Sequence, residues 1–170
     1  MPKIQSTLLS KISRSVGLFF ASALLALPVA ADEILQPSKG QSIYLPVYSH
    51  LWHGNLSAKG HPEILQLSAL ISIRNTDPVS SIRVLSARYY DTNGKLLREF
   101  VPAPKILAPL GTLELFVERR EAEGGSGANF VIRWQSDAPA SPPVTEAIHA
   151  DLNSVRTVSF VTVGRPVRGE

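Results

Sequence analysis

Apolar and polar residues alternate with a period of two along much of the chain. In the segment 65–74, Leu67, Ile71 and Ile73 share one parity, whereas Ser68 and Ser72 share the other. Because successive side chains of a strand point to opposite faces, this pattern predicts strands that bury one face. Further segments with the pattern are 42–49, 82–91, 95–101, 112–119, 129–136, 144–151 and 157–164.

These segments predict an all-β protein, an immunoglobulin-like antiparallel β-sandwich of about seven or eight strands. Outside the amino-terminal segment, no stretch shows the apolar stripe of a helix. Asn93–Gly94 predicts a tight hairpin with positive φ at both residues. Asp77 before Pro78 predicts a turn. Residues 32–40 and 165–170 are expected to be frayed tails.

The first 31 residues have the composition of a secretory signal peptide. They carry basic but no acidic residues, then an apolar run from Val16 to Leu27, and small residues before Asp32. This order predicts cleavage after Ala31, leaving 32–170 as a single domain without a stable membrane span. The mature protein is expected in the periplasm or secreted.

Charge and cysteine content narrow the classes of function. The chain has 17 basic and 14 acidic residues, and the predicted signal carries three of the basic ones. The mature chain is therefore formally neutral, which argues against binding to nucleic acid. The absence of cysteine excludes disulfides and a cysteine-linked lipid anchor.

The stretch "GGSGANF", Gly124 to Phe130, raises three alternatives. A phosphate loop would need a following Lys and a helix, and neither is present. A serine hydrolase would need Ser126 to meet His149 and Asp151, which alternation places on one strand face. The favoured interpretation is a structural reversal between strands, in which Asn129 bonds to the loop backbone.

A second cluster, "YSHLWHGN", contains the imidazoles of His50 and His53, with His61 close behind. Histidines at this density predict a zinc or copper site, with His149 as a further candidate ligand. The alternative is structural, with His50 and Tyr48 hydrogen-bonded at one end of the sandwich and Trp52 packed over the core edge. An exposed Trp52 on a loop would instead anchor a partner or a sugar ring.

Several motifs together resemble one known family. "GQSIYLPVYSHLWHG", "ISIRNTDP", "YYDTNGKLL", "GGSGANFVIRW" and "SFVTVGRPV" occur in this order between Gly40 and Val167. They look like the exported bacterial family catalogued as domain of unknown function 3124. The resemblance implies no activity and no catalytic residues. It does imply that the histidine stretch and the glycine-rich stretch both belong to the family's pattern.

The first functional hypothesis is therefore a non-catalytic module that binds an unknown protein or small ligand, or forms a homo-oligomer. Its expected surface consists of Tyr48, His50, Trp52, His53 and Asn129. The second is a periplasmic metal-binding protein that uses His50, His53 and His61. A hydrolase using Ser126 is the third and least favoured hypothesis.

Overall fold

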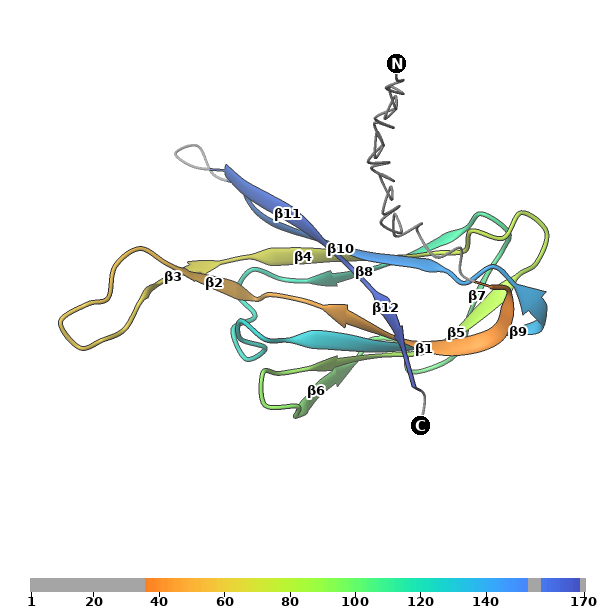
Figure 1. Ribbon diagram of the computed structural model, residues 1–170, viewed down its shortest axis with the longest axis horizontal. Coiled ribbons are helices and arrows are strands. Elements are labelled where there is room, and N and C mark those ends of the chain that lie inside the picture. The colour runs from red at the N-terminus through yellow and green to blue at the C-terminus, as the bar shows by residue number, and fades with distance from the viewer. Residues whose placement is uncertain (1–35, 153–156, 169–170) are drawn as a thin grey trace, which may run out of the picture. The chain divides into compact units, whose positions relative to one another are not determined.

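The computed structural model describes residues 36–152 and 157–168, and strands are its only regular elements (Figure 1). The predicted signal peptide, residues 1–31, lies outside the described residues. Within the described part of the chain, no helix is long and apolar enough to cross a membrane. The prediction of an all-β protein is confirmed.

The larger sheet has six antiparallel strands in the order β12-β1-β9-β5-β6, with β7 also paired to β5. Its centre is the longest strand, β9, which pairs with β1 on one side and β5 on the other. The six strands are β1 (Ser38–Pro46), β5 (Ile82–Tyr90), β6 (Leu96–Glu99), β7 (Lys105–Leu107), β9 (Asn129–Ala140) and β12 (Arg165–Val167).

The smaller sheet has four antiparallel strands in the order β11-β10-β4-β8. They are β4 (Ser68–Arg74), β8 (Thr112–Val117), β10 (Val144–Leu152) and β11 (Thr157–Val163). A separate two-stranded hairpin consists of β2 (His50–His53) and β3 (Glu63–Gln66). It extends away from both sheets in Figure 1.

One hydrophobic core joins the two sheets. The larger sheet contributes Phe130, Ile132 and Trp134 from β9, and the smaller contributes Ile71 and Ile73 from β4. Each of these side chains is at most 2% exposed. Burial of a side chain of this size contributes roughly 1.5–3 kcal/mol. The period of two therefore has its physical origin in this shared core.

The predicted number of strands was too low, since the described residues form twelve. The segment 65–74 divides at Leu67, whose backbone N–H donates to Ser49 O and not to a ladder. The result is β3 in the hairpin and β4 in the sheet. The other additions, β2, β7 and β12, have three or four residues each, too few for alternation to be recognised.

Both expected tails contain strand residues, so that prediction was wrong. β1 begins at Ser38, and β12 pairs with β1 through Ser42, Ile43 and Tyr44. Gly164 makes this possible because the chain passes so close to Thr145 that a Cβ would lie 1.9 Å from its hydroxyl oxygen. The chain can thus leave β11 and enter the larger sheet.

The two predicted turns are present. Asn93–Gly94 lies between β5 and β6, but only Gly94 has positive φ, because a longer turn replaces the expected two-residue one. Asp91 caps that turn by accepting from the N–H groups of Asn93 and Lys95. In the other turn, the carboxylate of Asp77 accepts from the backbone N–H groups of Val79, Ser80 and Ser141, which lower its pKa to about 2.

Beside this turn, the buried side chain of Asn75 joins three segments. Its Nδ2 donates to the carbonyl oxygens of Ser80, Leu107 and Ala108 at 2.9, 3.2 and 2.9 Å. Only 2% of Asn75 is exposed. An aspartate here would face three carbonyl oxygens without a donor.

We therefore expect Asn75→Asp to lower the free energy of unfolding at pH 7 by at least ~2 kcal/mol, because it removes the side-chain donor and places a buried carboxylate against three carbonyl oxygens. Asn93→Asp, the same change at an exposed turn position, should have an effect of less than ~0.5 kcal/mol. Chemical denaturation of both variants tests this. Equal effects would contradict the role assigned to Asn75.

Candidate functional site

The β2–β3 hairpin carries most of the surface residues that the sequence singled out. Its register pairs His50 with Gln66, Trp52 with Ile64, and His53 with Glu63. Trp52 therefore lies on a strand and not on the expected loop. Because directly opposed residues share a face, Trp52 and Ile64 form a cross-strand pair.

The Trp52–Ile64 pair faces solvent. Trp52 is 65% exposed and Ile64 55% exposed, and Leu56 in the connecting loop is 69% exposed. The expectation that Trp52 packs over the core edge is therefore wrong, because the hairpin lies outside the two-sheet core. We refer to Trp52 and Ile64 together as the hairpin patch.

The indole of Trp52 is held in place by its neighbour on the same face. Its Nε1 donates to Nε2 of His50 at 3.1 Å, and the two rings are stacked 6.5 Å apart. His50 thus orients the exposed tryptophan. This contact restricts the side-chain rotamers of Trp52, so a contact made through the indole would cost less side-chain entropy.

Ile64 is a surface residue of the hairpin that was not predicted from the sequence. A signal was present, because Ile64 has the parity of the polar positions Gln66 and Ser68 in the same alternating run. An apolar residue at an outward position is the sequence feature that indicates an exposed apolar surface. Leu70 in β4 also has this parity and is partly exposed.

The base of the hairpin is fixed by Tyr48 and His149. The backbone N–H of Tyr48 donates to Nε2 of His149 at 3.0 Å, so the neutral imidazole carries its proton on Nδ1. The ring of His149 stacks on Phe160 at 4.6 Å and meets Tyr48 edge-on. His149 is fully buried. His50 and Tyr48 were expected to be hydrogen-bonded at this end of the sandwich. The histidine that accepts from Tyr48 is His149 instead.

Burial of His149 removes the imidazole from water and lowers its pKa to about 4, with the backbone carbonyls of Phe160 and Ala147 partly opposing the shift. The neutral form is also the one that can accept from Tyr48. Protonation of His149 would therefore act against both its burial and its hydrogen bond.

The glycine-rich reversal lies beside the start of the hairpin. Gly125 O accepts from both the backbone N–H and the hydroxyl of Ser49, each at 3.1 Å. Thr92 holds the other side: its backbone N–H and its hydroxyl donate to Gly124 O, and its hydroxyl oxygen accepts from Gly127 N–H. Thr92 makes the loop contacts that were expected of Asn129, which instead pairs with Pro46 and Tyr90 at the start of β9.

These contacts fit the structural interpretation of the reversal. Gly125 has a φ of 77°, which favours glycine. Ser126 lies in the reversal, whereas His149 and Asp151 are 0% and 2% exposed. The two share an inward face of β10, and Asp151 forms an ion pair with Arg119 at 3.2 Å. Their burial gives the hydrolase hypothesis no geometric support.

The structure does not bring His50, His53 and His61 together. Three positions along one strand separate His50 from His53, so they lie on opposite faces. His53 Nδ1 is 3.8 Å from a Glu63 carboxylate oxygen, and His61 lies in the connecting loop. Within 36–152 and 157–168, no group of three or more His, Cys, Asp or Glu side chains is placed to hold a metal ion.

A buried contact makes Gly124 a test of the structural interpretation. A Cβ on Gly124 would lie 1.9 Å from the hydroxyl of Tyr89, which is 2% exposed and donates to Glu121 Oε2 at 2.6 Å. We expect Gly124→Ala to lower the free energy of unfolding by about 1–3 kcal/mol, because the ring of Tyr89, which packs against Phe100 and Phe130, or the loop would have to shift.

A double-mutant cycle with Tyr89→Phe identifies the cause. Removal of the hydroxyl should reduce the cost of Gly124→Ala by at least ~0.5 kcal/mol, as measured by denaturation. Strict additivity of the two substitutions would show that the hydroxyl is not what Gly124 accommodates.

The pKa of His149 generates a prediction about pH. The imidazole has a pKa of roughly 6.5 in the unfolded chain and takes up a proton there first as the pH falls. The free energy of unfolding should therefore decline between pH 6.5 and pH 4, by about 2 kcal/mol between pH 7.5 and pH 5. Above pH 6.5, this contribution is fully present.

Denaturation of the wild type, His149→Gln and His53→Gln over this pH range checks the assignment. His149→Gln should lose most of the dependence between pH 7.5 and pH 5, and His53→Gln should retain it. The same slope in the wild type and in His149→Gln would rule out His149 as the titrating group.

Comparisons with known proteins identify a family for the chain but assign no activity. No curated protein matches the chain. Among solved structures, the chain is similar to Thermotoga maritima 1070, with a TM-score of 0.42 and 13% sequence identity over 76% of this chain and 97% of that chain. The family model described as "Protein of unknown function (DUF3124)" matches residues 40–167. The resemblance drawn from the motifs is thus confirmed, and the chain belongs to the DUF3124 family.

Proposed function

We propose that this protein is an exported, non-catalytic binding module that docks a partner protein through the hairpin patch. In this proposal the two sheets form an immunoglobulin-like sandwich that serves as a rigid support. The location would be the periplasm or the extracellular space, as the predicted signal peptide indicates. The observation that carries the proposal is the exposure of the Trp52–Ile64 pair on a projecting hairpin.

The chemistry of the hairpin patch favours a protein partner. Tryptophan is enriched among the residues that dominate protein–protein binding energies, and one buried indole removes about 150–250 Å² from water. Trp52 and Ile64 together present aromatic and aliphatic surface on one face. The partner expected from this chemistry is a protein with an apolar groove wide enough for an indole.

The mechanical support of the hairpin also favours binding. An isolated two-stranded hairpin is marginally stable in water. Here its base is tied by Leu67 N–H to Ser49 O, and Ser49 in turn is tied to Gly125. These bonds connect the patch to the core strands, so docking does not first have to order the hairpin.

Site-specific photo-crosslinking in the producing cell tests the proposal. A benzophenone side chain at position 52 should give a discrete ultraviolet-dependent adduct with one protein. The matched control is position 79, where Val79 is 83% exposed but lies in the turn between β4 and β5. Position 79 should give no such adduct.

Binding of the identified partner can then be measured with purified proteins. Trp52→Ala should weaken binding by at least 2 kcal/mol, about 30-fold, while changing the free energy of unfolding by less than ~0.5 kcal/mol. Val79→Ala should change neither quantity. A crosslinked adduct with twice the mass of the chain would show that the partner is a second copy of this protein. The absence of any adduct at position 52 would refute the proposal.

A further inference from the structure

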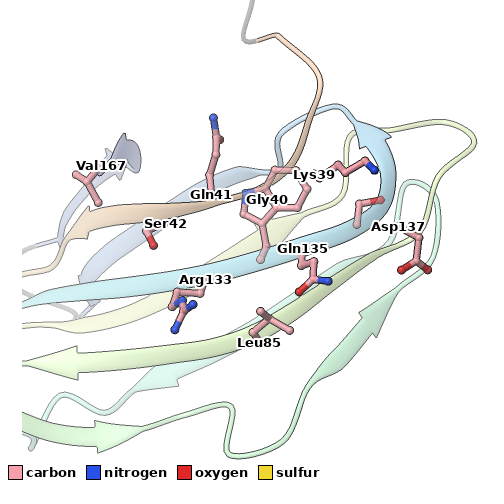
Figure 2. A pocket seen from close by; sticks show the side chains of 11 residues that line it. Lys39, Gly40, Gln41, Ser42, Leu85, Arg133, Gln135, Asp137 and Val167 are labelled. Atoms are coloured by element: carbon pink, nitrogen blue, oxygen red, sulfur yellow. The ribbon is translucent and has the colours of Figure 1, made fainter. Parts of the chain in front are cut away.

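A concave polar surface lies on the outer face of the larger sheet and shares no residue with the hairpin patch. Two adjoining hollows of about 740 and 210 Å³ share Ser42, Arg133 and Val167 in their linings. Figure 2 shows Ser42 and Arg133 projecting from the same side of the sheet. The function proposed above does not use this surface.

Irregularities in the strands give this part of the sheet its shape. The pairing of β1 with β9 shifts between Ser38 and Gly40, and that of β5 with β9 shifts between Val84 and Ser86. Such bulges bend strands and are frequent beside functional sites. A Cβ on Gly40 would lie 2.6 Å from the carbonyl oxygen of Trp134, so glycine permits the close approach.

At the centre of the surface, strand register places an arginine between two serines. Ser42 on β1 is opposite Arg133 on β9, and Arg133 is opposite Ser86 on β5. Direct cross-strand neighbours share a face, with Cβ atoms about 4.5–5.5 Å apart. One guanidinium and two hydroxyl groups therefore form a row on the outer face.

The hydroxyl groups in this row have an unusual environment. Ser42 and Ser86 are each 8% exposed, which is uncommon for side chains on the outer face of a sheet. In the described part of the chain, Ser86 Oγ has no hydrogen-bond partner. A buried hydroxyl without a partner costs stability, so a ligand oxygen would satisfy a group that the fold leaves unpaired.

The charge around the row is positive. Asp137 in the larger hollow is neutralised by the fork of Arg83 at 2.7 and 3.1 Å, and Arg88 in the smaller hollow pairs with Glu99. Lys39, Arg133 and Arg168 also line the hollows, and none of them forms an ion pair within the described residues. The predicted mature chain as a whole is formally neutral, so this excess of positive charge is local to the surface.

We propose that this surface binds an oxyanion, the phosphate or carboxylate group of a small molecule or of a lipid headgroup. The planar guanidinium of Arg133 recognises two oxygens of the anion, as its fork geometry suits phosphate and carboxylate. The hydroxyls of Ser42 and Ser86 donate to the anion from either side. Lys39 and Arg168 add long-range attraction at the rim.

Titration calorimetry at low ionic strength tests the site with inorganic phosphate and citrate as probes. The wild-type protein should bind at least one of the two, and Arg133→Gln should weaken that binding at least tenfold. The matched control is Arg74→Gln, the same change on the outer face of β4 in the smaller sheet, which should have no effect.

A second variant separates a binding role from a structural one. Ser86→Ala removes the unpaired hydroxyl, so the melting temperature without ligand should stay constant or rise, while affinity for the probe falls about fivefold or more. A lowered melting temperature with unchanged affinity would show that Ser86 serves the fold and would overturn its assignment.

Co-sedimentation with vesicles distinguishes the two sources of the anion. Binding to phosphatidylglycerol vesicles but not to phosphatidylcholine vesicles, lost in Arg133→Gln, would identify a headgroup. Binding of free phosphate or citrate alone would identify a small molecule. Absence of binding to all probes, or equal losses in Arg133→Gln and Arg74→Gln, would overturn the proposal.

Discussion

The position of the β2–β3 hairpin depends on the carbonyl group of Gly125. It accepts two hydrogen bonds from Ser49, a residue 76 positions earlier in the chain, while Thr92 binds the same reversal from the opposite side. Together with the bonds of Val47 to Ala128 and of Tyr48 to His149, they fix the course of the chain between β1 and β2. The hairpin patch is therefore positioned in part by a backbone carbonyl group of the glycine-rich reversal.

This arrangement separates the requirements of folding from those of recognition. Gly124 and Gly125 are needed for their small size and their conformation, and His149 for a neutral imidazole in a closed site. The groups to which we assign the proposed binding lie elsewhere, at Trp52 on the hairpin and at Arg133 on the outer face of the larger sheet. Substitution of Gly124, Gly125 or His149 should change the free energy of unfolding. Substitution of Trp52 or Arg133 should change the proposed binding.

The strands could be predicted where a single buried face extends over six or more residues. β8 and β9 are of this kind, because the local pattern records which side chains enter the core. The hairpin between β5 and β6 was predictable for a similar reason, since Asn93 and Gly94 act locally. His149 and Asp151 were correctly placed on one strand face by the same alternation.

The remaining features depend on contacts between distant segments. Alternation along β10 predicts that His149 points inward. It does not predict that the imidazole accepts a hydrogen bond from the backbone N–H of Tyr48, 101 positions away. The row formed by Ser42, Arg133 and Ser86 depends on the order of three strands in the sheet, which no local pattern encodes. Trp52 was assigned to a loop because β2 has only four residues, and its exposure depends on the hairpin's lying outside the core.

The short strand β12 has a consequence for the protein's behaviour at high concentration. It covers the backbone edge of β1, whose N–H and C=O groups would otherwise be free to pair with another chain. β12 is itself a poor template for such pairing, because it has three residues, one of them Pro166, which lacks an N–H, and another the charged Arg165. β12 thus shields the β1 edge at Ser42, Ile43 and Tyr44, and its removal would leave the nine-residue β1 as an unpaired edge strand of the larger sheet, where it could pair with a second chain.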